Sequence, residues 1–175
     1  MLEVEIKAYC DDPDALRARV AELGGALEGS LIEEDSYFNH PSRDFAETDE
    51  AFRIRRTPEG PVVTYKGPKI GERSKTRYEN EVPIGDADAF SDILTRLGFR
   101  PVRVVKKRRE LYALEGAHVC LDSIEGLGDF AEIEILSEDR EEAEKKLFSL
   151  AEKLELSRFE RRSYLELLLE SDSSR

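Results

Sequence analysis

The stretch that decides the fold is Leu2-Glu3-Val4-Glu5-Ile6-Lys7-Ala8. Charged and aliphatic residues alternate along it, and successive side chains of a β-strand point to opposite faces of a sheet. One face therefore carries Glu3, Glu5 and Lys7, and the other face is aliphatic. The same alternation returns in later segments, some of them mainly basic and others mainly acidic. This predicts a sheet whose charged face holds a charged ligand.

Length and composition narrow the class of protein. A chain of 175 residues suits one domain with a hydrophobic core, so we expect a single domain over residues 1–175. The 27 basic and 39 acidic residues give a net charge of −12, which disfavours non-specific binding to nucleic acid or to an anionic membrane surface. The sequence has no apolar run of about 18 residues and no signal-peptide pattern. Cys10 and Cys120 form no metal motif or disulfide framework. We therefore expect a cytoplasmic protein that binds neither nucleic acid nor membrane.

Hydrophobic periodicity and turn residues predict an α+β fold. Strands are expected at 2–8, 27–39, 51–56, 62–66, 75–84, 102–113, 118–124 and 130–136. Helices are expected at 13–23, 87–97 and 140–154, with a short one at 162–169, and residues 171–175 are expected to fray. Residues 40–49 and 67–74 are expected to be loops. Because the connections are of hairpin length, the strands should pair antiparallel.

Most predicted strands place charged residues on one face. The basic ones are Arg53, Arg55, Lys66, Lys75 and Arg77, and the acidic ones are Glu79, Glu81, Asp122, Glu132 and Glu134. In 105–109 the spacing leaves two registers open, because either Lys107 and Arg109 or Lys106 and Arg108 can share a face.

Closure of these strands into a barrel would explain the pattern. Amphipathic helices would cover the aliphatic faces from outside, and the charged faces would point inward. Inward cations repel one another unless carboxylates or a bound polyanion relieve them. A triphosphate matches Lys and Arg donors, and Mg²⁺ or Mn²⁺ matches carboxylate oxygens. The alternative is an outward charged face with cross-strand ion pairs, but the helices then lack an apolar surface on which to pack.

The same residues carry a resemblance to a known family. Glu3-Val4-Glu5-Ile6-Lys7 resembles the ExExK signature of the CYTH superfamily, the triphosphate tunnel metalloenzymes. The resemblance continues almost end to end, through Phe52-Arg53-Ile54-Arg55, Thr64-Tyr65-Lys66, Arg77, Lys107-Arg108-Arg109, Asp122 and residues 128–134. ExExK alone is a weak pattern, but its combination with Glu132-Ile133-Glu134 is specific. The resemblance implies an eight-stranded antiparallel β-barrel with helices packed outside and a tunnel that binds triphosphate with Mg²⁺ or Mn²⁺.

The resemblance also implies roles for individual residues. The metal ligands would be Glu3, Glu5, Asp122, Glu132 and Glu134. The triphosphate contacts would be Lys7, Arg53, Arg55, Lys66, Arg77, Lys107 and Arg109. The family's K-x-R spacing selects Lys107 and Arg109, which leaves Lys106 and Arg108 pointing outward. Lys7 is the candidate catalytic residue, as a general base, if burial and neighbouring cations lower its pKa.

Members of the family differ in chemistry, and three functions stay open. The first is that of a class IV adenylyl cyclase, which converts ATP to cyclic AMP and pyrophosphate. The second is hydrolysis of tripolyphosphate or of a nucleoside or thiamine triphosphate. The third is non-catalytic binding of polyphosphate or nucleotide. Tyr37 and Phe38 either stack on a base at the tunnel mouth or pack in the core. The leucines of 165–169 either contact a partner chain, which would make a homodimer, or cap the barrel.

Overall fold

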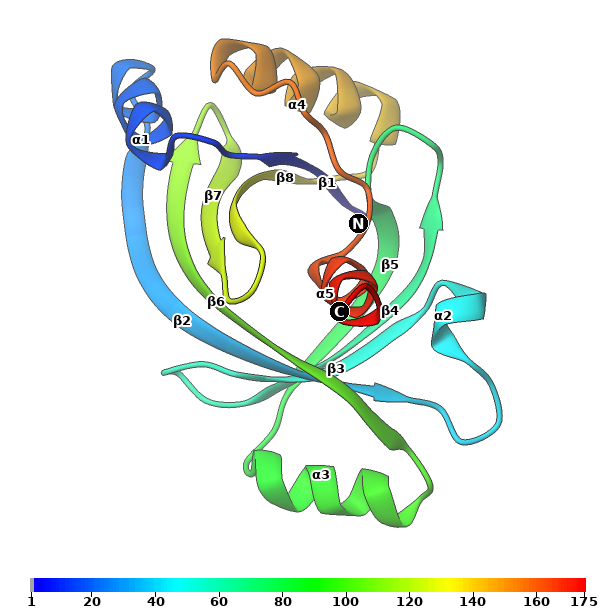
Figure 1. The fold of residues 1–175 in the computed structure, drawn as a ribbon. Helices are drawn as coiled ribbons and strands as arrows, with labels where there is room; N and C mark the ends of the chain where they lie inside the picture. Colours follow the sequence, from blue (N-terminus) through cyan, green and yellow to red (C-terminus); the bar gives the residue numbers. More distant parts are fainter. Residues whose placement is uncertain (1) are drawn as a thin grey trace.

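A computed structural model describes residues 2–175 and shows the expected closed, eight-stranded antiparallel barrel (Figure 1). The strands are β1 (Leu2–Tyr9), β2 (Ala26–Asn39), β3 (Ala51–Arg56), β4 (Val62–Ile70), β5 (Thr76–Pro83), β6 (Arg100–Leu114), β7 (Ala117–Ile124) and β8 (Gly128–Ser137). They pair in the order β1-β5-β4-β3-β2-β6-β7-β8, and β8 pairs with β1 to close the ring. The predicted fold class is therefore confirmed.

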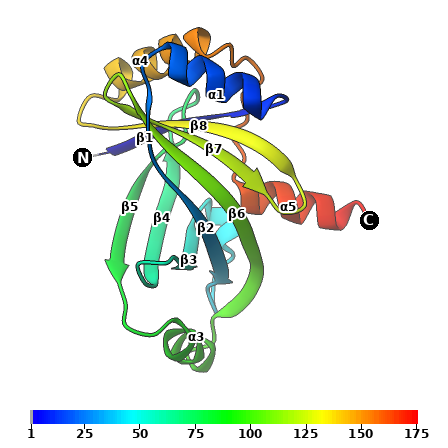
Figure 2. The same cartoon turned by 90° about the vertical axis from the view of Figure 1, so that its left-hand side faces the viewer.

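Five helices accompany the barrel in the described part of the chain. They are α1 (Pro13–Glu22), α2 (Phe45–Thr48), α3 (Ala87–Arg96), α4 (Arg140–Lys153) and α5 (Tyr164–Ser173). Helices α1 and α4 cover one side, and α3 lies at the opposite end (Figures 1 and 2). Helix α5 packs against β6, and its first residue reaches the barrel interior. None of the helices within residues 2–175 is long and apolar enough to cross a membrane.

The aliphatic face of β1 decides which way its charges point. Val4 and Ile6 are buried against Leu147 and Leu150 of α4 in one hydrophobic cluster. Burying one such side chain contributes about 1.5–3 kcal/mol. Because side chains alternate along a strand, this packing turns the charged face of β1 into the barrel.

Two further hydrophobic clusters hold α5 and α3 on the outside of the barrel. Val105 and Phe130 pack with Leu167 and Leu168 of α5, and Ile54 packs under α3. The leucines of 167–168 therefore cap this chain's own barrel. The predicted homodimer is not tested by these contacts and stays a prediction.

Three predictions about local structure were wrong. The expected loop after Lys66 is a continuation of β4, where a register shift between Lys66 and Lys69 accommodates Pro68 without a ladder hydrogen bond. The expected loop 40–49 contains α2, which begins where the Asp44 side chain accepts the Ala46 N–H at 3.0 Å. The tail expected to fray is helical through Ser173, because α5 is packed on the barrel.

The core packing leads to a stability prediction. Leu147 is fully buried, so Leu147→Ala should lower the free energy of unfolding by about 2–5 kcal/mol through lost apolar contact and a residual cavity. Leu97→Ala, at a side chain that is 64% exposed, should change it by about 0.5 kcal/mol or less. Urea unfolding followed by circular dichroism measures both, and equal losses would contradict the assigned core.

Candidate functional site

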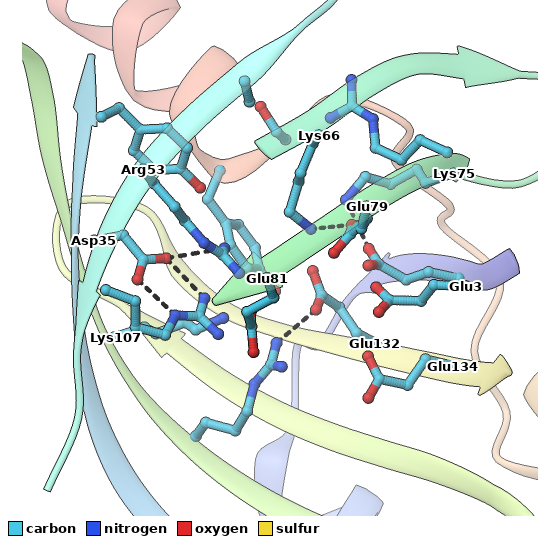
Figure 3. A pocket seen from close by; sticks show the side chains of 18 residues that line it. Glu3, Asp35, Arg53, Lys66, Lys75, Glu79, Glu81, Lys107, Glu132 and Glu134 are labelled. Atoms are coloured by element: carbon cyan, nitrogen blue, oxygen red, sulfur yellow. Dashed lines mark hydrogen bonds and ion pairs between the residues drawn. The ribbon is translucent and has the colours of Figure 1, made fainter. Parts of the chain in front are cut away.

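The barrel encloses a cavity of about 170 Å³ that is lined almost entirely by charged side chains (Figure 3). Within the described residues its lining includes seven carboxylates, Glu3, Glu5, Asp35, Glu79, Glu81, Glu132 and Glu134. It also includes seven cations, Arg53, Arg55, Lys66, Lys75, Arg77, Lys107 and Arg109. A protein of net charge −12 thus gathers an equal number of cations and carboxylates in one enclosed space.

Strand register brings opposite charges next to one another. Arg109 on β6 lies opposite Asp122 on β7, and Asp35 on β2 lies opposite Arg55 on β3. Residues directly opposite one another in an antiparallel pair have their Cβ atoms about 5 Å apart, which is close enough for ion pairing. The alternation seen in the sequence therefore becomes a lattice of ion pairs once the sheet closes.

The basic side of the cavity centres on Arg55. Its Nε donates to Asp35 Oδ1 at 2.7 Å, and its Nη1 lies 2.9 Å from Glu33 Oε1. Lys107 Nζ lies 3.1 Å from the other oxygen of Glu33. Burial would raise the pKa of Asp35, but Arg53 and Arg55 outweigh it and hold that pKa well below its usual range. Asp35 is therefore a charged anchor that orients the guanidinium groups.

Two buried guanidinium nitrogens on the cavity wall have no partner among the described residues. They are Arg53 Nε and Arg77 Nε. A buried N–H without an acceptor costs about 1–3 kcal/mol. Both side chains also line the cavity, so their guanidinium groups are candidate donors to the oxygen atoms of a bound anion, which makes the cavity a fit for phosphate groups.

The acidic side contains a trio of carboxylates, Glu3, Glu5 and Glu134, with one oxygen of each within 4.8 Å of the others. Burial, together with neighbouring carboxylates, raises the pKa of Glu3 to about 7, and burial also raises the pKa of Glu134 to about 7. Each therefore resists ionisation while the trio is without a cation. Three hard oxygen donors at this spacing fit a divalent cation such as Mg²⁺ or Mn²⁺.

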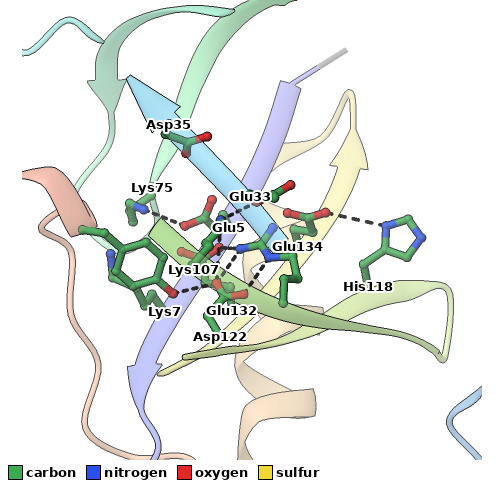
Figure 4. A network of polar contacts seen from close by, with 12 residues as sticks. Glu5, Lys7, Glu33, Asp35, Lys75, Lys107, His118, Asp122, Glu132 and Glu134 are labelled. Atoms are coloured by element: carbon green, nitrogen blue, oxygen red, sulfur yellow. Dashed lines mark hydrogen bonds and ion pairs between the residues drawn. The ribbon is translucent and has the colours of Figure 1, made fainter. Parts of the chain in front are cut away.

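Arg109 lies between the basic and the acidic side of the cavity and pairs with two carboxylates. Its Nε donates to Asp122 Oδ1 at 2.7 Å and its Nη2 donates to Glu132 Oε2 at 2.5 Å. Glu132 is buried, which alone would raise its pKa, but Arg109 and nearby lysines hold that pKa well below its usual range. Figure 4 shows Asp122, Glu132 and Lys107 converging at this point. In this structure Glu132 contacts Arg109, while Glu134 contributes to the carboxylate trio.

Lys7 and Asp122 lie behind the cavity wall, beneath Tyr164. Lys7 is 1% exposed, its Nζ donates to the carbonyl oxygen of Arg162, and it lies 4.3 Å from the centre of the Tyr164 ring. Tyr164 donates its hydroxyl proton to Asp122 Oδ2 at 2.8 Å. Burial, and then the charge of Lys75, lowers the pKa of Lys7 to about 7. The start of α5 therefore covers both residues.

The structure brings most of the predicted site residues together. Six of the seven predicted triphosphate contacts and four of the five predicted metal ligands line the cavity, and the exceptions are Lys7 and Asp122. Lys106 and Arg108 are exposed on the outer face, as predicted. The sequence interpretation missed Glu33 and Asp35. Their spacing in β2 matches the alternation that identified the other strands, and this signal could have found them.

The raised pKa of Glu134 gives a pH-dependence prediction. Between the ordinary pKa of 4.5 and the folded value of about 7, the folded state binds more protons than the unfolded state. The free energy of unfolding therefore falls as the pH rises through this window. Glu134→Gln removes the titration, so its stability relative to the unsubstituted protein should rise by on the order of 1–3 kcal/mol between about pH 5 and pH 8.

Urea unfolding in EDTA at both pH values measures this difference. Glu141→Gln, at an exposed position of α4, is the control and should show no such change. A stability difference for Glu134→Gln that stays constant with pH would show that the carboxyl titrates normally.

Comparisons with known proteins agree with this geometry. Residues 1–164 match the family model of the CYTH domain. A Methanocaldococcus jannaschii protein provisionally named an adenylate cyclase is 42% identical over 172 residues, which cover 95% of this chain and 98% of that protein. Adenylate cyclase CyaB of Aeromonas hydrophila is 35% identical, with 97% of this chain and 90% of that protein covered. The solved structure of the PH1819 protein of Pyrococcus horikoshii has a TM-score of 0.89 and 47% identity, with 97% and 99% covered.

Proposed function

This chain belongs to the CYTH domain family, and from that premise we propose that it is a metal-dependent enzyme acting on a triphosphate. The observation that supports this most is the enclosed cavity, in which basic side chains face a trio of carboxylates. The reaction proposed first is that of a class IV adenylyl cyclase, which forms cyclic AMP and pyrophosphate from ATP. Two relatives above 30% identity carry adenylate cyclase names, which supports this order.

In the proposed complex the phosphates lie against the basic side of the cavity. Arg53 and Arg55 offer guanidinium donors that Asp35 already orients. Preorganised donors of this kind stabilise the charge that develops during phosphoryl transfer. Glu3, Glu5 and Glu134 would hold Mg²⁺ or Mn²⁺, which when bound draws negative charge from phosphate oxygens.

For cyclisation, the 3′-hydroxyl oxygen of ATP forms a bond to the α-phosphorus, and the bond from that phosphorus to the bridging oxygen breaks. Pyrophosphate leaves, and the hydroxyl proton passes to a base. We propose Lys7 for that base, because burial and Lys75 lower its pKa to about 7. Its Nζ contacts the Arg162 carbonyl oxygen, so it must leave that contact to reach a nucleophile.

The runner-up reactions use the same site. In a tripolyphosphatase, or a nucleoside or thiamine triphosphatase, water attacks the terminal phosphorus and phosphate is released. A non-catalytic module would bind the triphosphate without turnover. Parallel incubations of the protein with Mn²⁺ and ATP, tripolyphosphate or thiamine triphosphate, followed by chromatography of the products, separate the three. We expect cyclic AMP and pyrophosphate in equal amounts from ATP. Free phosphate from any of the three substrates without cyclic AMP would favour the hydrolase, and no turnover of any of them would favour the binding module.

The proposed roles of the carboxylates as metal ligands and of the cations as phosphate ligands give a second prediction. Glu134→Gln removes one metal-ligand charge and should lower turnover about a hundredfold or more, on the order of 3 kcal/mol. Its binding of tripolyphosphate in EDTA should persist or tighten, because a repelling carboxylate is gone. Arg55→Ala should weaken that metal-free binding, because a charged donor to phosphate is lost.

Turnover assays with Mn²⁺ measure the first effect. Calorimetric titration with tripolyphosphate in EDTA measures the second. Arg108→Ala is the matched control, since Arg108 is exposed on the outside of the same barrel and should keep both binding and turnover. If folded Glu134→Gln and Arg55→Ala proteins lost metal-free binding equally, the separation into metal ligands and phosphate ligands would be wrong.

A further inference from the structure

Lys75 forms a direct ion pair with one member of the carboxylate trio. Its Nζ donates to Glu5 Oε1 at 2.6 Å, and the two side chains are only 11% and 9% exposed (Figure 4). Within residues 2–175, Glu5 is the one member of the trio that pairs with a lysine or an arginine. The protein therefore places a cation of its own on a carboxylate that the metal ion would use.

The backbone around Lys75 is fixed, so the part of this residue that can move is its side chain. The Lys75 N–H donates to the Glu5 carbonyl oxygen at 2.8 Å. Ser74 and Thr76 are buried beside α4, where their hydroxyl oxygens lie 2.7 Å apart and Ser74 Oγ donates to Glu144 Oε1 at 2.6 Å. These contacts hold Lys75 at the cavity wall, while its flexible four-carbon stem lets the ammonium reach other oxygen atoms.

A divalent ion bound to the trio would compete with Lys75 for Glu5. Carboxylate oxygens bind such an ion at about 2.0–2.6 Å, so both cations would lie close together on one carboxylate. Their repulsion is about twice that between two single charges at the same distance. Because the ion pair is nearly buried, dissolved salt screens this repulsion only weakly. Metal binding therefore favours the departure of the Lys75 ammonium from Glu5.

The displaced ammonium needs a new acceptor, and a triphosphate would supply it. Lys75 lines the charged cavity, where an ammonium without its carboxylate would be a buried, unpaired charge. Phosphate oxygens in the same cavity can replace the lost partner with charge-assisted hydrogen bonds. The metal therefore frees a donor for the triphosphate, and the triphosphate lowers the cost of displacing that donor.

We propose that Lys75 occupies the carboxylate trio in the metal-free protein and moves from Glu5 to the triphosphate when the metal binds. Lys75 is then a phosphate contact that depends on the metal, unlike Arg53 and Arg55, whose partner Asp35 lies outside the trio. This inference rests on the proposed function and adds a coupling between its two ligands, in which each favours the binding of the other.

Calorimetric titration measures this coupling. The probe is imidotriphosphate, a tripolyphosphate analogue whose P–N–P bridges resist cleavage, and the coupling ratio is its Kd in EDTA divided by its Kd in Mn²⁺. Binding of Mn²⁺ to the free probe is the same for every variant and cancels when the variants are compared. Lys75→Met removes the charge but keeps the length of the side chain. We expect it to lower the Kd of Mn²⁺ alone about tenfold and to lower the coupling ratio about tenfold.

Lys66→Met is the matched control. Lys66 lines the same cavity, but its ammonium pairs with Glu79, which is not a member of the trio. Both variants lose the same charge from the same cavity, so a general electrostatic effect would appear in both. We expect Lys66→Met to weaken the binding of imidotriphosphate with and without Mn²⁺ alike, and to keep the coupling ratio within about twofold of that of the unsubstituted protein.

A crystal structure of the unsubstituted protein with Mn²⁺ and imidotriphosphate keeps the proposal testable if Lys75→Met fails to fold. We expect Lys75 Nζ to lie at hydrogen-bond distance from a phosphate oxygen and no longer on Glu5. Lys75 still paired with Glu5 beside a bound Mn²⁺ ion would overturn the inference.

The outcomes separate this inference from the proposed function. A coupling ratio that Lys75→Met leaves unchanged, or that both lysine variants lower equally, would overturn the displacement of Lys75 and leave the proposed function standing. If the unsubstituted protein bound neither Mn²⁺ nor imidotriphosphate, the proposed function would fail, and the inference with it.

Discussion

The structure depends on pairing between inward-facing cations and carboxylates across neighbouring antiparallel strands. An ion buried without a partner costs several kcal/mol, so a barrel lined by seven cations alone would not close. The strand register meets this cost by placing carboxylates opposite basic residues, as with Asp35 and Arg55 or Asp122 and Arg109. The hydrophobic clusters outside the barrel then fix the charged faces inward. Fold and site are therefore consequences of the same alternation.

Pairing is incomplete at two places, and these are the places where a ligand fits. Glu3 and Glu134 sit so near other carboxylates, in so buried a position, that their pKa values rise to about 7. Arg53 Nε and Arg77 Nε lack acceptors among the described residues. In the proposed complex a divalent cation would neutralise the carboxylates, and phosphate oxygens would accept hydrogen bonds from the arginines. We therefore propose that a metal–triphosphate complex completes the network of charges in the barrel.

The sequence was sufficient for the barrel and for most of its lining, because a period of two specifies which side chains share a face. It was not sufficient for contacts made between distant segments. Lys7 and Asp122 lie on inward faces as expected, but Tyr164 of α5 covers them, and no local pattern reports where that helix docks. Pro68 indicated a loop, yet a register shift allows β4 to continue through it.

The central claim is that the carboxylate trio holds a metal ion while the cations opposite hold a triphosphate. A crystal structure with Mn²⁺ and tripolyphosphate, with diffraction recorded for manganese anomalous scattering, tests it most directly. We expect an anomalous peak at coordination distance from Glu3, Glu5 and Glu134, with phosphate oxygens against Arg53 and Arg55. Manganese and phosphate bound only outside the barrel, with the interior ion pairs unchanged, would contradict it.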